Sequence, residues 1–449
     1  MVLDGSVSAV NATEKLYSLL LKRDADAERT LPDDVRRNVP RNGLRLVAAN
    51  ALQSSGDQTV NASTVLPWLF DALGVPPALT GVLVPIRESG SMLPQAFLTP
   101  LVLRVRQRKG VFITGALVQA VSVALMAATA AFGSGLVAGL TIVALLAVFS
   151  LGRCLCSISS KDVQGRTVPK GNRGQINGLA TTASGLVAIT LGLGIRFLGD
   201  QEVDAGQLAW LLAGGAVLWV LVAVLYSGIR EPAGEAQPVR EPGDVEGWFG
   251  RTIALLREDR DFRRFVVVRS FLLVSALSPP FVVALSVDSG SDGLAGLGGF
   301  IIASGLAALL GGRLFGRLAD RSSRTLMTAG AGTASGIIIV LVVIVSLPGF
   351  SGDTTTGSLV FIGSYLLLTL MHTGVRVARK TYIVDLAEGD RRTTYVAVSN
   401  SAMGLVLLVV GGISSLLAIL GIVWALGFLA LMGLVGVFAG ARLPEVSRR

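Results

Sequence analysis

The chain has 449 residues, of which 51% are hydrophobic and only 15% are charged, and its mean hydropathy is +0.65. Because a soluble domain has about 25% charged residues, this composition excludes a soluble globular protein and is typical of an integral membrane protein. The apolar runs are about twice as long as a transmembrane β-strand of roughly ten residues, which excludes a β-barrel and predicts an all-α bundle.

Residues 1–42 are rich in charge and are predicted to form a cytoplasmic N-terminal segment, without a removable signal peptide. Twelve runs of span length follow, in two sets of six. They lie near 43–72, 77–103, 110–132, 135–158, 174–198, 207–229, 262–287, 293–316, 325–347, 357–378, 394–419 and 421–441. The sequence therefore predicts twelve transmembrane helices in two pseudo-symmetric six-helix bundles, 43–229 and 262–441, and a cytoplasmic tail at 442–449.

The two predicted bundles are joined by a polar linker at residues 230–261. It begins with a stretch rich in proline, glycine and acids and continues as WFGRTIALLREDRDFRRF, in which Trp248, Ile253 and Phe262 can share one helical face. We expect an interfacial helix on the cytoplasmic membrane surface. The alternative is a solvated linker that happens to contain apolar residues.

Positive charge gathers in the short even-numbered connections. These basic segments lie at 104–109, 161–173, 313–324 and 376–392, whereas the odd-numbered connections hold Arg196 and otherwise acids. By the positive-inside rule, both termini are cytoplasmic and the protein is integral to the cytoplasmic (inner) membrane. The net charge of +9 is explained by this asymmetry, so no nucleic-acid partner is expected.

Polar residues in the first span follow a helical stripe. Asn50, Ser54, Asp57, Asn61 and Thr64 succeed one another at steps of three or four residues, which would place all five on one face of a single helix. A carboxylate within the bilayer is costly unless it faces protein or water. The stripe therefore predicts a polar cavity, with Asp57 and Asn61 as lining residues.

The second span carries Arg87, Glu88 and Gln95. Neighbouring residues on a helix point about 100° apart, so Arg87 and Glu88 need not pair with each other and are expected to find partners on other helices. Two interpretations stay open for these groups and for Asp57. They handle substrate or protons, or they form a structural charge network that holds helices together.

Further basic residues lie in the fourth, seventh and tenth spans, namely Arg153, Arg269, His372 and Arg376. We include them as cavity candidates. The three arginines can equally extend to the membrane interface, and a lone histidine is more often a hydrogen-bonded core residue than a proton carrier. A proline pair after Arg269, at 279–280, predicts a kink in the seventh span.

The eighth connection reads GRLADRSSR from Gly316 to Arg324. This segment resembles the loop signature of the major facilitator superfamily, in which a glycine is followed by an Asp-Arg pair and a further basic residue. The resemblance implies that the first, fourth, seventh and tenth helices line a central path. It also implies a cytoplasmic gate formed by Gly316, Asp320, Arg321 and Arg324. The second glycine of the signature is Ser323 here, and the matching loop of the first half has Arg104 in place of the acid.

Together these features predict a secondary active transporter of a small organic solute that works by alternating access. Arg87 can hold an anionic group, and Asp57 or Glu88 can couple proton movement to transport. One alternative is a scaffold, receptor or assembly factor on the same fold that transports nothing. The other is a translocator of lipids or amphiphiles, or a drug exporter.

Several other functions are disfavoured by the sequence. It has no GxxxxGK[ST] loop for ATP, and one histidine with two clustered cysteines, Cys154 and Cys156, offers little for enzymatic or metal chemistry. We expect no catalytic residues, cofactor or bound metal. The expected partners are the lipid bilayer, a small-molecule substrate and protons, with the protein as a monomer.

Overall fold

The computed structural model describes residues 14–20, 28–29, 33–95, 98, 102, 104–169, 204–233, 254–290, 293–386 and 391–446, with parts of 176–193. Within 293–320 and 380–397 the side chains of some residues are not described. Every regular element in these ranges is a helix. The all-α prediction is therefore confirmed for the described part of the chain.

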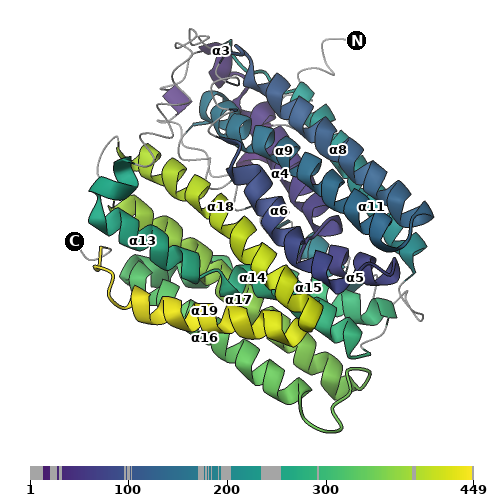
Figure 1. Cartoon of the computed structure of the whole chain (residues 1–449). Helices are drawn as coiled ribbons and strands as arrows, with labels where there is room; N and C mark the ends of the chain where they lie inside the picture. The colour runs from purple at the N-terminus through teal and green to yellow at the C-terminus, as the bar shows by residue number, and fades with distance from the viewer. Residues whose placement is uncertain are drawn as a thin grey trace.

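Figure 1 shows two groups of helices lying side by side. We call them the N-terminal half and the C-terminal half. The N-terminal half comprises α3 (Asp33–Arg36), α4 (Val39–Thr59), α5 (Val65–Ala72), η1 (Pro77–Leu79), α6 (Thr80–Met92), α8 (Arg108–Phe132), α9 (Gly135–Thr167) and α11 (Ala205–Ser227). The C-terminal half comprises α13 (Arg260–Phe271), α14 (Val274–Asp288), α15 (Gly293–Arg321), α16 (Ser323–Val345), α17 (Thr355–Leu386), α18 (Arg391–Leu420) and α19 (Ile422–Gly440).

Eight helices in the described residues are long and apolar enough to cross a membrane. They are α8, α9, α11, α13 with α14, α16, α19, and most of α17 and of α18. A shorter apolar stretch, Gly296–Gly311, lies in α15. The expected fifth span, 174–198, falls largely outside the described residues, and α4 to α6 are too polar or too short to count. The number twelve therefore stays a prediction.

The first span is not one helix, so the prediction of a single continuous stripe was wrong. Helix α4 ends at Thr59 and α5 begins at Val65. In between, the carbonyl of Asn61 accepts from the amides of Thr64 (3.4 Å) and Leu66 (3.0 Å), and its side-chain oxygen accepts from the Ser63 amide (2.8 Å). Short polar side chains compete in this way with helical backbone bonds, which explains the break.

The seventh span is interrupted as well. Helix α13 ends at Phe271 and α14 begins at Val274, while Pro279 and Pro280 lie inside α14. The break thus precedes the proline pair, which the sequence had indicated as the irregular point. The first and seventh spans occupy matching places in the two halves. Paired discontinuities of this kind are typical of binding sites in transporters built from repeats.

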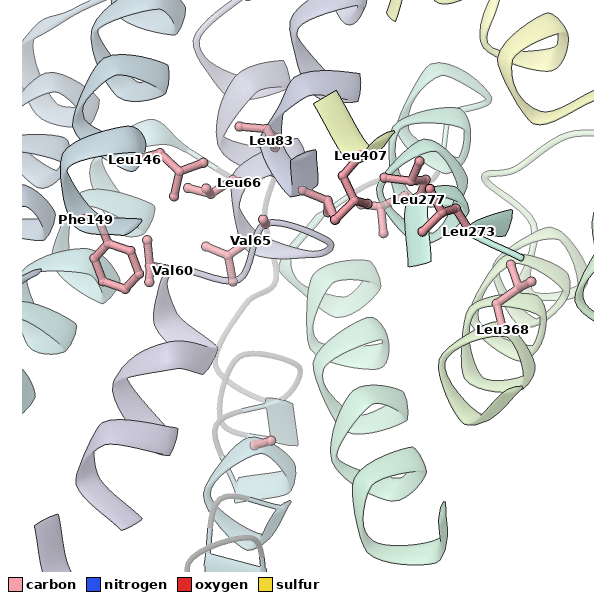
Figure 2. Packing of buried hydrophobic residues seen from close by; sticks show 14 of the residues in the cluster. Val60, Val65, Leu66, Leu83, Leu146, Phe149, Leu273, Leu277, Leu368 and Leu407 are labelled. Carbon is pink, nitrogen blue, oxygen red and sulfur yellow. The ribbon is translucent and has the colours of Figure 1, made fainter. Parts of the chain in front are cut away.

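The two halves meet along α6 and α18, where small residues allow close approach. A side chain on Gly81 would meet Ser415, and one on Gly411 would meet the ring of Pro85. The Ser89 hydroxyl donates to the Gly404 carbonyl at 2.7 Å. Figure 2 shows the apolar core on both sides of this seam, with Leu146 and Phe149 in one half and Leu273, Leu277 and Leu407 in the other.

Ionic contacts secure the ends of both halves where α3, α13 and the C-terminus lie (Figure 1). In the N-terminal half, Glu231 accepts from the backbone amides of Arg108 (3.1 Å) and Lys109 (2.8 Å) at the start of α8. In the C-terminal half, Glu445 lies 3.6 Å from Arg324 near the start of α16. Each half therefore has a glutamate after its last helix that contacts the beginning of its third span, which is α8 in the N-terminal half and α16 in the C-terminal half.

The linker and the N-terminal segment are described in part. Residues 248–253 of the predicted interfacial helix, including Trp248 and Ile253, lie outside the described residues. Residues 254–258 are helical, and the remainder of the segment, including the buried Phe262, belongs to the start of α13 and its N-cap. Residues 14–20 form a short helix whose Tyr17 is fully buried and covers Gly43 of α4. The N-terminal segment is thereby attached to the bundle.

Candidate functional site

A cavity of about 160 Å³ lies between the two halves. Residues 61–63 from the break in the first span line it, as do Leu273 and Ser275 from the break in the seventh. Side chains of α6, α15, α17 and α18 complete the wall. A water needs about 10–15 Å³ of such space, so the cavity has room for on the order of ten water-sized groups.

The N-terminal wall contains an ion triad. The Oδ1 atom of Asp57 in α4 accepts from Arg87 of α6 at 3.0 Å and from Arg153 of α9 at 2.5 Å. Arg87 lines the cavity, whereas Asp57 and Arg153 stand behind it. One carboxylate thus joins three helices and compensates one of its two guanidinium neighbours.

Glu88, beside Arg87 in sequence, faces a different set of groups. It lines the cavity together with Arg376 and Arg379 of α17. Its strongest electrostatic neighbours are Arg376, Arg153, Arg87 and Arg379, yet no ion pair within 4 Å joins Glu88 to any of them in the part of the chain that is described. Asp57 and Glu88 therefore differ in role: Asp57 is part of a closed triad, and Glu88 faces the cavity.

Arg269 stands at the end of α13 in the opposite wall. Its side chain is only 6% exposed and donates to the hydroxyl of Ser399 and, at 3.3 Å, to the Oδ1 atom of Asn400, both in α18. These partners are neutral. No carboxylate lies within ion-pair distance of Arg269 among the described residues, so this buried cation lacks a counter-ion there.

Three residues of α17 extend the basic wall, namely His372, Arg376 and Arg379. A guanidinium nitrogen of Arg376 lies 3.2 Å from the Nε2 atom of His372. Sequence reasoning placed Arg379 in a cytoplasmic connection, whereas α17 continues to Leu386 and carries it to the cavity. The spacing of four and three residues from His372 to Arg379 was the signal that could have identified it.

Several polar atoms in the cavity wall are buried without a hydrogen-bond partner among the described residues. They are the Nε atoms of Arg87 and Arg269, the hydroxyls of Ser275 and Thr369 and the Nδ1 atom of His372. Buried polar groups are nearly always paired in proteins. A concentration of such atoms around one cavity is typical of a binding site.

The remaining candidates lie elsewhere. Gln95 donates to the Ser91 carbonyl at 2.8 Å and is absent from the described cavity wall. Of the gate residues, Arg321 is exposed, and Arg324 donates to the Leu443 carbonyl at 2.9 Å, so it contacts the C-terminal tail of its own half. The surroundings of Gly316 and the side chain of Asp320 are not described.

Metal-binding groups are sparse. The described residues contain no cluster of three His, Cys, Asp or Glu side chains that could hold a metal ion. Cys154 and Cys156 are free and buried, and the thiol of Cys156 donates to the carbonyl of Phe112 at 3.4 Å. The two cysteines therefore pack as small apolar side chains.

Comparison with known proteins gives a consistent result. The family model of the Major Facilitator Superfamily matches residues 47–363. Among solved structures, the inward-open xylose transporter XylE from E. coli aligns with a TM-score of 0.63 at 13% identity, over 90% of this chain and 96% of that chain. No curated protein matches the sequence.

Two further solved structures share the fold. The nucleoside transporter NupG aligns with a TM-score of 0.61 at 13% identity, over 89% of this chain and 98% of its own. A POT family transporter in complex with a thioalcohol conjugated peptide gives 0.67 at 12% identity, over 92% and 98%. At such low identity the similarity establishes the fold alone.

Proposed function

This chain belongs to the major facilitator superfamily, and we propose that it is a secondary active transporter that moves a small anionic organic solute by alternating access. The observation that supports this most directly is the charge of the cavity. Its described wall contains four arginines and one carboxylate, drawn from both halves.

The excess positive charge favours an anion. Arg87, Arg269, Arg376 and Arg379 face Glu88 alone, while Asp57 and Arg153 form a pair behind the wall. Three positive charges in the described wall are thus uncompensated. Arg269 is buried, Arg87 and Arg379 are partly buried, and Arg376 is exposed. Burying positive charge is costly in a medium of low dielectric constant, and a solute that carries negative charge reduces this cost.

The arrangement of the halves suits alternating access. The cavity lies at the breaks of the first and seventh spans, so a bound solute touches irregular backbone from each half. The glycine-lined seam between α6 and α18 provides a smooth surface along which the halves can tilt. Rocking about this seam would expose the cavity to one side of the membrane at a time.

Glu88 is our candidate for the coupling group. As a carboxylate it competes with an anionic solute for Arg376 and Arg379, because all of them face the same cavity. Protonation of Glu88 removes this competition, so a proton and an anion bind cooperatively. Symport of the anion with a proton follows from this linkage, with Asp57 holding Arg87 and Arg153 in place.

The proposed setting is the cytoplasmic (inner) membrane, with both termini in the cytoplasm and the protein working as a monomer. The basic connections support this orientation through the positive-inside rule. Within it, Glu231 and Glu445 lie at the cytoplasmic ends of their halves. The gate role of Asp320, Arg321 and Arg324 remains part of the proposal.

Uptake into proteoliposomes tests this function. Purified protein would be reconstituted and offered labelled anionic, neutral and cationic solutes with and without an inward proton gradient. We expect uptake of an anionic solute that the gradient stimulates and a protonophore abolishes. Glu88→Gln should remove the stimulation, whereas Arg442→Gln, at an exposed residue outside the cavity, should transport like the parent protein.

Two results would count against the proposal. A transporter of uncharged or cationic solutes would show uptake of those classes only. A scaffold or assembly factor would show no uptake of any class, with Glu88→Gln leaving its cellular role intact.

A further inference from the structure

Three of the unpartnered atoms around the cavity are hydrogen-bond donors only, whereas the hydroxyls of Ser275 and Thr369 can donate or accept. An arginine Nε carries a hydrogen and can only donate, which applies to both Arg87 and Arg269. The ring of His372 can be assigned in the same way. Because Arg376 donates to its Nε2 atom, Nε2 accepts, and in the neutral ring the hydrogen then resides on Nδ1. The unpartnered Nδ1 of His372 is therefore also a donor.

A cavity wall with unpartnered N–H donors favours a ligand that carries hydrogen-bond acceptors. Carboxylate and phosphate oxygens only accept when ionised, and guanidinium groups bind them with paired, charge-assisted hydrogen bonds. An ammonium group has no acceptor, so it would leave these donors unsatisfied and add to the positive charge. The chemistry of the wall thus agrees with its charge.

The donors lie in both halves. Arg87 belongs to α6 of the N-terminal half, while Arg269 belongs to α13 of the C-terminal half. Each is held in place from behind by other groups, Arg87 by Asp57 and Arg269 by Ser399 and Asn400. Each therefore keeps its Nε–H group free of protein partners in the described chain.

We propose that the cavity binds a short organic solute with an anionic group at each end, one held by Arg87 and the other by Arg269. This inference rests on the proposed transport of an anion and narrows its substrate class to two-ended dianions. A dianion leaves one of the three excess charges uncompensated, whereas a monoanion leaves two. Only a solute charged at both ends satisfies the guanidinium donors of both halves at once.

Substitution of Glu88 is expected to raise the affinity for a dianion, whereas damage to the site would lower it. The Glu88 carboxylate lines the same cavity and repels a dianion. Glu88→Gln should therefore tighten dianion binding, by about tenfold, although it removes a charged residue from the site. Damage to the fold would weaken binding instead, so the direction of the change separates the two explanations.

The experiment is isothermal titration of the purified, full-length protein with three probes. Succinate carries a carboxylate at each end, its half-amide succinamate replaces one carboxylate by a neutral group of similar shape, and ethyl phosphate places its charge at one end. We expect succinate to bind tighter than succinamate by about tenfold to a hundredfold, the effect of an unmade charged hydrogen bond. Ethyl phosphate should bind more weakly than succinate.

Variants assign the two ends. Arg87→Gln and Arg269→Gln should each bring succinate and succinamate to within about threefold of each other, because each leaves only one cationic anchor. Arg269→Lys provides a milder change if the glutamine variant fails to fold, and it should keep part of the preference. Arg442→Gln is the matched control outside the cavity and should keep all of it.

Equal affinity of the parent protein for succinate and succinamate would overturn the inference. So would a higher affinity for ethyl phosphate than for succinate, or a lower succinate affinity in Glu88→Gln than in the parent protein. The inference would also fail if none of the three probes bound to the protein. These results leave the transport proposal standing if the liposomes still accumulate a singly charged anion. That proposal fails on different evidence, the absence of anion uptake.

Discussion

The two halves of the molecule treat their buried charges in different ways. In the N-terminal half, Asp57 binds both Arg87 and Arg153, so a carboxylate of the protein compensates one of these two positive charges. In the C-terminal half, Arg269 is anchored only by neutral groups, and Arg376 contacts His372. The N-terminal wall thus contains ion pairs within the protein, while Arg269 in the C-terminal wall has only neutral partners among the described residues.

This difference separates two roles that look alike in sequence. An ion triad that joins α4, α6 and α9 contributes to folding, because removing one member leaves buried charges without partners. An arginine held by neutral groups gains little for the fold from its charge. The anionic ligand proposed above would pair with this arginine in the cavity wall. The predictions below test this contrast between stability and binding.

The largest effect is expected from Asp57→Asn. The substitution leaves Arg87 and Arg153 facing each other without their shared carboxylate, which is only 19% exposed. Breaking a buried pair in this way costs about 3–5 kcal/mol, and we expect the lower end because Arg153 is 30% exposed. Thermal unfolding of the purified variant measures the loss. An unchanged midpoint would show that the triad does not hold the N-terminal half together.

Arg269→Gln should have the reverse profile. We expect anion affinity to fall by about tenfold to a hundredfold, while the unfolding free energy changes by less than that of Asp57→Asn. The lost bonds to Ser399 and Asn400 are offset by removal of a buried, uncompensated charge. Binding and unfolding would be measured on the same preparation. A stability loss equal to that of Asp57→Asn would abolish the contrast between the halves.

A smaller effect is expected at Glu231 in the N-terminal half. Its side chain is 0% exposed and accepts from two backbone amides at the start of α8. Glu231→Ala leaves these amides unsatisfied at a helix N-terminus and should cost about 2 kcal/mol. Chemical unfolding in detergent would measure it. A loss near zero would mean that solvent replaces the carboxylate without penalty.

The smallest effect is expected from Glu445→Ala, the counterpart in the C-terminal half. Glu445 is 21% exposed, and its partner Arg324 is 33% exposed and 3.6 Å away. Solvent screens such a pair, so we expect a loss of about 0–1 kcal/mol. The same unfolding assay makes it a matched control for Glu231→Ala. A greater loss than that of Glu231→Ala would show that Glu445 stabilises the C-terminal half more than Glu231 stabilises the N-terminal half.

Much of the candidate site was visible in the sequence. Ionisable residues in apolar spans are rare enough that Arg87, Glu88 and Arg269 stood out by type and position alone. Arg379 was assigned to a connection because it follows the apolar run of the tenth span. The sequence there reads the same whether the helix ends with the apolar run or continues past it. The continuation of α17 decided its place.

The break in the first span was equally hidden. The steps from Asn50 to Thr64 fit a helix, and the local bonds of Asn61 that interrupt it compete with helical bonds of nearly equal strength. Tertiary packing around the cavity decides between them. Polar periodicity therefore identified the stripe without showing where the helix ends.

By itself, the sequence determined the class of the protein: an all-α membrane bundle with repeated apolar spans and a superfamily loop signature. These depend on hydropathy and local spacing, which any segment carries with it. Only the tertiary structure decided which charges compensate each other. The pairing of charges depends on distances between helices that are far apart in sequence. In the folded chain Asp57 forms ion pairs with Arg87 and Arg153, while Arg269 lines the cavity without a carboxylate partner among the described residues.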